Sequence, residues 1–176
     1  MDPTHRIDLY VKILTVPFIS VADLVRSMRQ VYEPHGIRVF VAGSEVLQLP
    51  TLMDIDVGAC DQSALTSEQL ELFGNRNGVP ADGIAVYFIR STNPPLNGCA
   101  AHIRDSPALV VTQLASRWSL AHEVGHVLGL DHVADTDRLM TGNGTFTITN
   151  PPPDLINSEI DTIRSSPFVK PFSTTP

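Results

Sequence analysis

Residues 122–132 read His-Glu-Val-Gly-His-Val-Leu-Gly-Leu-Asp-His. On a helix, His122 and His126 lie one turn apart on one face, and two such imidazoles can bind a single metal ion. Gly129 can end that helix, because glycine adopts the left-handed conformation at little cost, and the chain can then bring back His132 as a third ligand. The apolar positions of the helix lie on the opposite stripe, at Leu120, Ala121, Val124, Val127 and Leu128.

Three protein ligands favour a catalytic zinc site, since the fourth position stays free for water. Zinc lowers the pKa of a bound water toward about 7. Glu123 directly follows the first ligand, so we expect it to take the proton of that water as general base and to return it to the departing amine. The sequence therefore predicts one catalytic Zn²⁺ on His122, His126 and His132, and hydrolysis of a peptide bond.

The composition excludes several other classes of protein. The chain has 176 residues and a formal net charge of −7. This length suits one domain with its own core, and an acidic chain is poorly suited to bind nucleic acid or an anionic membrane surface. No apolar run approaches the roughly 18 residues of a membrane helix, and residues 1–6 lack a signal-peptide pattern. We expect one monomeric domain over residues 1–176, without a nucleic acid or membrane partner, in a compartment that the sequence leaves open.

Hydrophobic patterns along the chain predict an α/β fold. Residues 7–13 alternate as a half-buried strand, a helix follows the capping sequence at Ser20, and residues 37–41 form a second strand. A strand, a helix and a strand in this order favour a parallel pair joined by a crossover. Other expected elements are strands over 84–89, 99–103 and 108–112, an irregular stretch over 42–65, a helix capped by Thr66, the histidine helix capped by Ser116, and a last helix over 155–164.

The stretch 122–132 resembles the signature of the metzincin zinc metallopeptidases, His-Glu-x-x-His-x-x-Gly-x-x-His. In that clan a tight turn containing a methionine lies beneath the metal, and residues 138–142 fit this turn, with Met140 as the methionine. The resemblance implies a twisted, mixed five-stranded sheet with an antiparallel edge strand, an active-site helix and a small C-terminal subdomain. The upper subdomain would span about residues 1–129 and the lower one about 130–176.

The resemblance also implies how substrate is bound. Residues 99–103 would form the edge strand and pair with a peptide or protein substrate as an added strand. The loop after Met140 would wall the pocket for the residue that follows the scissile bond. The implied contacts are Cys99, Ala100, Ala101 and His102 in the strand and Phe146 in the loop. Some metzincins carry a tyrosine two residues after the methionine, where this chain has Gly142.

Two other functions stay open at this point. Some bacterial endoribonucleases that mature ribosomal RNA carry a similar His-Gly-x-x-His-x-x-Gly-x-Asp-His motif, which residues 130–132 resemble. Glu123, Met140 and the net charge of −7 argue against an RNA substrate. The chain could also be a zinc domain that only binds a partner, although such a domain would most readily lose Glu123.

Two weaker patterns complete the analysis. Asp54, Asp56 and Asp61 could hold calcium, but their spacing fails the EF-hand pattern, so an acidic turn is the better interpretation. Cys60 and Cys99 are equally consistent with one disulfide or with two free thiols.

Overall fold

The structure is a computed structural model that describes residues 3–172. Its strands are β1 (His5–Ile13), β2 (Ile37–Val46), β3 (Asp54–Asp56), β4 (Ile84–Ile89), β5 (Ser91–Asn93), β6 (Gly98–Cys99), β7 (Ala108–Thr112) and β8 (Lys170–Pro171). Its α-helices are α1 (Val21–Tyr32), α2 (Ser67–Gly74), α3 (Ser119–Val127) and α4 (Asn157–Ser165). None of the helices in this part of the chain is long and apolar enough to cross a membrane.

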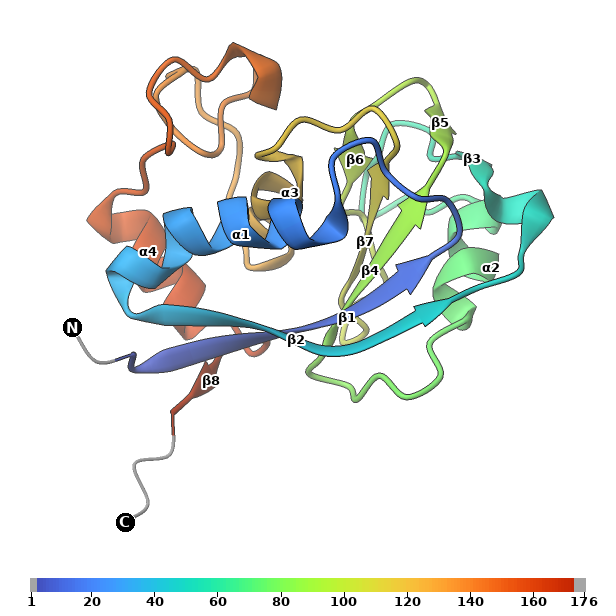
Figure 1. The fold of residues 1–176 in the computed structure, drawn as a ribbon, viewed down its shortest axis with the longest axis horizontal. Helices are drawn as coiled ribbons and strands as arrows, with labels where there is room; N and C mark the ends of the chain where they lie inside the picture. Colours follow the sequence, from blue (N-terminus) through green and yellow to red (C-terminus); the bar gives the residue numbers. More distant parts are fainter. Residues whose placement is uncertain (1–2, 173–176) are drawn as a thin grey trace.

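A mostly parallel sheet has the strand order β2-β1-β4-β7-β6 (Figure 1). β1 runs parallel to β2 and β4, β4 runs parallel to β7, and β6 lies at the edge, antiparallel to β7. The predicted α/β class, with an antiparallel edge strand, is confirmed. The sheet has six strands rather than the predicted five, because β8 also pairs with β1. β8 has only two residues, too few to show a strand pattern in the sequence. β3 and β5 form a separate pair.

Two apolar cores lie on the two faces of this sheet. Alternation along β4 directs Ile84 and Phe88 to one face, and Ala85 and Tyr87 to the other. Helices α1, α3 and α4 contribute to the first core, whereas α2 and β3 contribute to the second. Because both faces of the sheet are covered, β4 and β7 are buried along their whole length rather than at alternate positions.

Local capping sequences set the starts of the helices. The Ser20 side chain accepts a hydrogen bond from the Asp23 backbone N–H, and Thr66 forms a reciprocal capping box, as predicted. The predicted cap of α3 is wrong by two residues, because the N-cap is Trp118 and not Ser116. Ser116 Oγ accepts a hydrogen bond from the Trp118 N–H in the turn that precedes the helix, and α3 itself begins at Ser119.

Three strands differ from their predicted limits, and β1 does so only by beginning two residues earlier, at His5. β2 continues to Val46 instead of ending at residue 41, so part of the stretch expected to be irregular is a strand with mostly exposed side chains. The edge strand is confined to Gly98–Cys99, because the ladder to β7 is interrupted after Cys99. Pairing resumes only at the isolated bridge between Ile103 and Ser106. The predicted strand 99–103 is therefore one arm of a hairpin with a broken ladder.

Candidate metal centre

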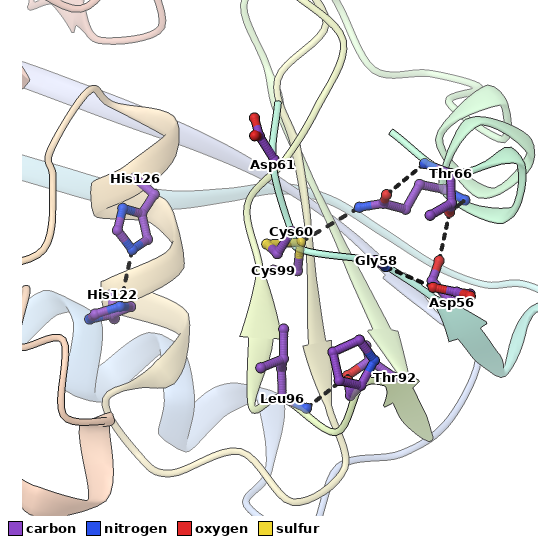
Figure 2. Close-up of a disulfide and its surroundings, with 12 residues drawn as sticks. Asp56, Gly58, Cys60, Asp61, Thr66, Thr92, Leu96, Cys99, His122 and His126 are labelled. Carbon is purple, nitrogen blue, oxygen red and sulfur yellow. Dashed lines mark hydrogen bonds between the residues drawn. A yellow bond between two sulfur atoms is a disulfide. The ribbon is translucent and has the colours of Figure 1, made fainter. Parts of the chain in front are cut away.

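The three predicted metal ligands meet at one point of the structure. The Nε2 atom of His122 lies 3.2 Å from Nε2 of His126 and 3.2 Å from Nε2 of His132. The Nε2 atoms of His126 and His132 are 3.0 Å apart. The first two residues belong to α3 (Figure 2), and His132 belongs to the segment that follows it.

Backbone carbonyls fix the orientation of two of these rings. The Nδ1 of His122 donates to Leu139 O, and the Nδ1 of His126 donates to Leu130 O, each over 2.8 Å. Since a carbonyl oxygen only accepts, each Nδ1 carries the hydrogen and each Nε2 presents a lone pair. Burial lowers the pKa of His122 to about 4 and also lowers the pKa of His126, so both rings are neutral at neutral pH.

This donor set fits a zinc ion. The Nε2 lone pairs of His122 and His126 face each other over 3.2 Å with no hydrogen between them, which is unfavourable unless a cation lies there. Tetrahedral zinc with Zn–N bonds of about 2.0–2.1 Å separates its nitrogen ligands by about 3.3 Å. The observed separations of 3.0–3.2 Å come close to that value.

The end of α3 brings the third histidine to the other two. Gly129 has φ of 99°, in the left-handed region where the sequence predicts the helix to end. The Leu130 N–H donates to Gly125 O over 3.0 Å, which closes the final turn of the helix. The carbonyl of Leu130 is also the acceptor for His126. One turn therefore ends the helix, orients the second imidazole and directs the chain toward His132.

Met140 lies against α3 and is fully buried. A Cβ built on Gly125 would lie 2.5 Å from Met140 Sδ, so the thioether packs directly on the helix at this position. The Val133 N–H donates to Met140 O, and the Gly142 N–H donates to Val133 O, each over 2.8 Å. These bonds join the segment around Met140 to the residue that follows His132.

Glu123 lies beside the histidines and lines the same cleft. The residue is only 8% exposed, and burial raises the pKa of its carboxyl to about 8 in the protein without a metal ion. A buried carboxyl that faces a cleft can exchange a proton with a molecule bound there. Its geometry therefore suits an acid–base group.

The cleft has a volume of about 890 Å³. Besides Glu123 and the three histidines, it is lined by residues 59–62, 95–98, 100–101 and 129–131, and by four residues between 141 and 145. Three of the lining residues are carboxylic acids, namely Asp61, Glu123 and Asp131, and no lysine or arginine is among the described residues that line it. The cleft therefore has an acidic lining.

Cys60 and Cys99 form a disulfide. The sequence had left open whether they form a disulfide or remain two free thiols. It joins the segment after β3 to the edge strand β6, and Figure 2 shows this link next to α3. Both partners therefore stay fixed relative to each other at the cleft, which residues 59–62 help to line.

The three aspartates considered for calcium are each bonded to groups of the protein. Asp54 forms an ion pair with Arg90. Asp56 and Asp61 each accept a hydrogen bond from the backbone N–H two residues further on, over 2.7 and 2.8 Å. This is the bonding of an acidic turn.

The residues suggested as substrate contacts are placed unevenly. Ala100 and Ala101 line the cleft, whereas Cys99 is fully buried in its disulfide. His102 is buried and is not among the lining residues. Its ring packs edge-on against Phe168, with the two ring centroids 6.1 Å apart. Phe146 is 67% exposed and also lies outside the lining.

Sequence reasoning missed several residues of the cleft. Gly98 and Asp61 both line it, and neither was expected there. Gly98 ends a run of asparagine and proline residues that resembles an ordinary turn, and only its place just before the predicted edge strand could have marked it. Asp61 lies at the cleft because its neighbour Cys60 is joined to Cys99 by a disulfide, and no local sequence pattern indicates that this disulfide forms.

No protein-family model and no curated protein matches the sequence. Among solved structures, archaemetzincin from Methanopyrus kandleri has a TM-score of 0.58 at 13% identity and covers 90% of this chain and 94% of its own. Archaemetzincin from Archaeoglobus fulgidus, complexed with malonate, has a TM-score of 0.52 at 16% identity, covering 88% of this chain and 99% of its own. Metalloproteinase-II from Bacteroides fragilis has a TM-score of 0.58 at 15% identity and covers 93% of this chain, which spans only 54% of that protein. The fold of this chain is therefore the one found in these metallopeptidase structures.

Proposed function

We propose that this chain is a zinc-dependent endopeptidase of the metzincin type. The observation that carries the proposal is the convergence of three imidazole Nε2 atoms beside a buried carboxyl in an open cleft. The fold shared with archaemetzincins supports it. The segment 138–142, whose Met140 packs beneath α3, would be the methionine turn of that clan.

His122, His126 and His132 would hold the zinc ion. When bound, zinc acts as a Lewis acid that polarises a carbonyl and lowers the pKa of water toward about 7. The carbonyls of Leu139 and Leu130 keep the first two imidazoles aimed at a common point, so little reorganisation is needed when a metal enters.

Glu123 would move the proton. It accepts a proton from the attacking water and then gives it to the nitrogen of the scissile amide. An amide nitrogen leaves poorly until it is protonated, so the second transfer is needed to break the C–N bond. The side chain supports both steps because it is enclosed by protein yet lines the cleft in which a peptide would lie.

The edge strand β6 would hold the substrate backbone. β6 is the last strand of the sheet and has a partner on one side only. The Thr112 N–H donates to Asn97 O over 3.0 Å, so the alternation of an antiparallel ladder turns the N–H and C=O of Gly98 away from β7. An extended peptide could pair with these groups as an added strand and lie across Glu123.

The acidic lining of the cleft favours a peptide over RNA. The carboxylates of Asp61 and Asp131 would repel phosphate groups, and the described lining residues include no lysine or arginine to bind them. The endoribonuclease alternative therefore has no support at this site.

The test is peptide-library cleavage by the zinc-loaded protein, together with its metal content. We expect one zinc ion per chain, cleavage that is lost after chelation, and loss of both zinc and cleavage in His126→Ala. His35→Ala is the matched control, because it removes an imidazole that does not line the cleft and should keep zinc and cleavage. Stoichiometric zinc in His126→Ala, or no cleavage by the zinc-loaded wild type, would contradict the proposal.

A further inference from the structure

Gly98 of β6 lies directly against the side chain of Glu123. A Cβ built on Gly98 would lie 2.6 Å from Glu123 Cγ and 2.9 Å from both Cδ and Oε1. Real side chains do not tolerate a carbon–carbon approach of 2.6 Å, so any residue with a Cβ here forces either Glu123 or the edge strand to move. The contact therefore involves the methylene Cγ of Glu123 as well as its carboxyl group, and not only the flexible end of the side chain.

The edge strand has little freedom to move away from Glu123. Asn97, just before Gly98, accepts a hydrogen bond from Thr112 on β7. Cys99, just after it, pairs with β7 and carries the disulfide to Cys60. The backbone at Gly98 is therefore held on both sides, and a larger residue there would displace the glutamate more readily than the strand.

Packing, rather than hydrogen bonding, orients the glutamate. Within residues 3–172, no side-chain hydrogen bond of the protein involves the Glu123 carboxylate, although the residue is only 8% exposed. The fixed backbone of β6 on one side and α3 on the other confine the side chain. Glycine at position 98 is what lets this backbone approach so closely.

We propose that Gly98 is a positioning residue, which holds the Glu123 carboxyl in its orientation toward the cleft by a contact that only glycine permits. The inference rests on the proposed peptidase function, in which Glu123 carries the proton. Gly98 acts through Glu123, while its own N–H and C=O stay available to a substrate strand.

The kinetic test compares Gly98→Ala with the wild type. We expect kcat to fall by at least about tenfold, with KM changed by less than about threefold and zinc content unchanged, because the backbone groups at position 98 remain. Gly74→Ala is the matched control, since a Cβ on Gly74 at the end of α2 meets nothing within 4 Å. A wild-type kcat in Gly98→Ala would overturn the proposal.

A second test needs neither zinc nor activity. In the zinc-free protein, Gly98→Ala should lower Tm by about 5 °C when Glu123 is present, and by less than about 2 °C in the Glu123→Ala background. An equal drop in both backgrounds would show that the alanine contacts something else and would overturn the inference. Should Gly98→Ala fail to fold, a folded Gly98→Ala/Glu123→Ala protein would support the contact, and failure of the double variant would contradict it.

These two tests separate the inference from the proposed function. If the zinc-loaded wild type cleaves no peptide, the peptidase proposal fails, and the Tm comparison still decides whether Gly98 restrains Glu123. If the wild type cleaves and Gly98→Ala cleaves equally well, the peptidase proposal stands and Gly98 is not a positioning residue.

Discussion

The Nδ1 atom of His122 lies 2.8 Å from the carbonyl oxygen of Leu139, so this imidazole of the candidate metal centre is anchored to the segment that carries Met140. A ring held through its second nitrogen keeps one tautomer and one orientation. Met140 in turn packs on Gly125 of α3. The helix α3 and the segment around Met140 therefore hold each other in place through His122 and through Met140.

Met140→Ala is expected to lower the free energy of unfolding by about 2–5 kcal/mol, because it removes a fully buried side chain and leaves a cavity against Gly125. Met140→Leu keeps the volume and should cost less than about 1.5 kcal/mol. Urea unfolding of the zinc-free proteins measures both values, and zinc titration should show weaker binding by the alanine variant. Equal stability of Met140→Ala and the wild type would contradict this packing.

Loss of the disulfide between Cys60 and Cys99 is expected to lower the free energy of unfolding by about 4 kcal/mol, because the bond joins residues separated by 39 positions. KM should also rise, since the disulfide fixes residues 59–62 at the cleft. Urea unfolding with and without a reductant measures the stability change. The Cys60→Ser/Cys99→Ser protein is the control and should not respond to the reductant. An unchanged urea midpoint on reduction of the wild type would contradict the expectation.

Stability should decline above pH 10, partly through Tyr87. Its hydroxyl donates to Asn75 O over 3.0 Å, and burial raises the pKa of Tyr87 to about 12. The unfolded chain loses this proton near pH 10, so the stabilisation is complete below pH 10 and is lost as pH rises toward 12. At pH 11 the loss from Tyr87 is about 1 kcal/mol relative to pH 9.

The check is urea unfolding at pH 9 and pH 11 for the wild type and Tyr87→Phe. The variant should lose less stability between these two pH values. Tyr32, whose pKa burial also raises, remains in both proteins and contributes equally to each. The same loss in both proteins would rule out Tyr87 as the source.

The predictions that succeeded rest on local physics. Ser20 and Thr66 cap helices because side-chain oxygens near a helix start satisfy free N–H groups, and this pattern is visible in a few residues. Gly129 marks the end of the helix for an equally local reason, its positive φ. The three histidines were predicted to meet because helix geometry and one short turn suffice to bring them together.

The failures concern contacts between distant segments. The pairing of Cys60 with Cys99 depends on how the segment after β3 crosses the edge strand, which no pattern near either cysteine encodes. His102 follows residues that line the cleft, yet the interrupted ladder leaves it buried beside an aromatic ring near the C-terminus. Gly98 looks like a turn residue until Glu123, 25 positions further along the sequence, is placed against it.

The most direct test of the central claim is the rate of peptide cleavage by Glu123→Gln, measured beside the wild type with equal zinc content. The substitution keeps the size of the side chain and removes its ability to accept a proton. We predict that Glu123→Gln binds one zinc ion per chain and cleaves at least about 100-fold more slowly. Cleavage at the wild-type rate by the zinc-loaded variant would contradict the assignment of Glu123 as the group that moves the proton.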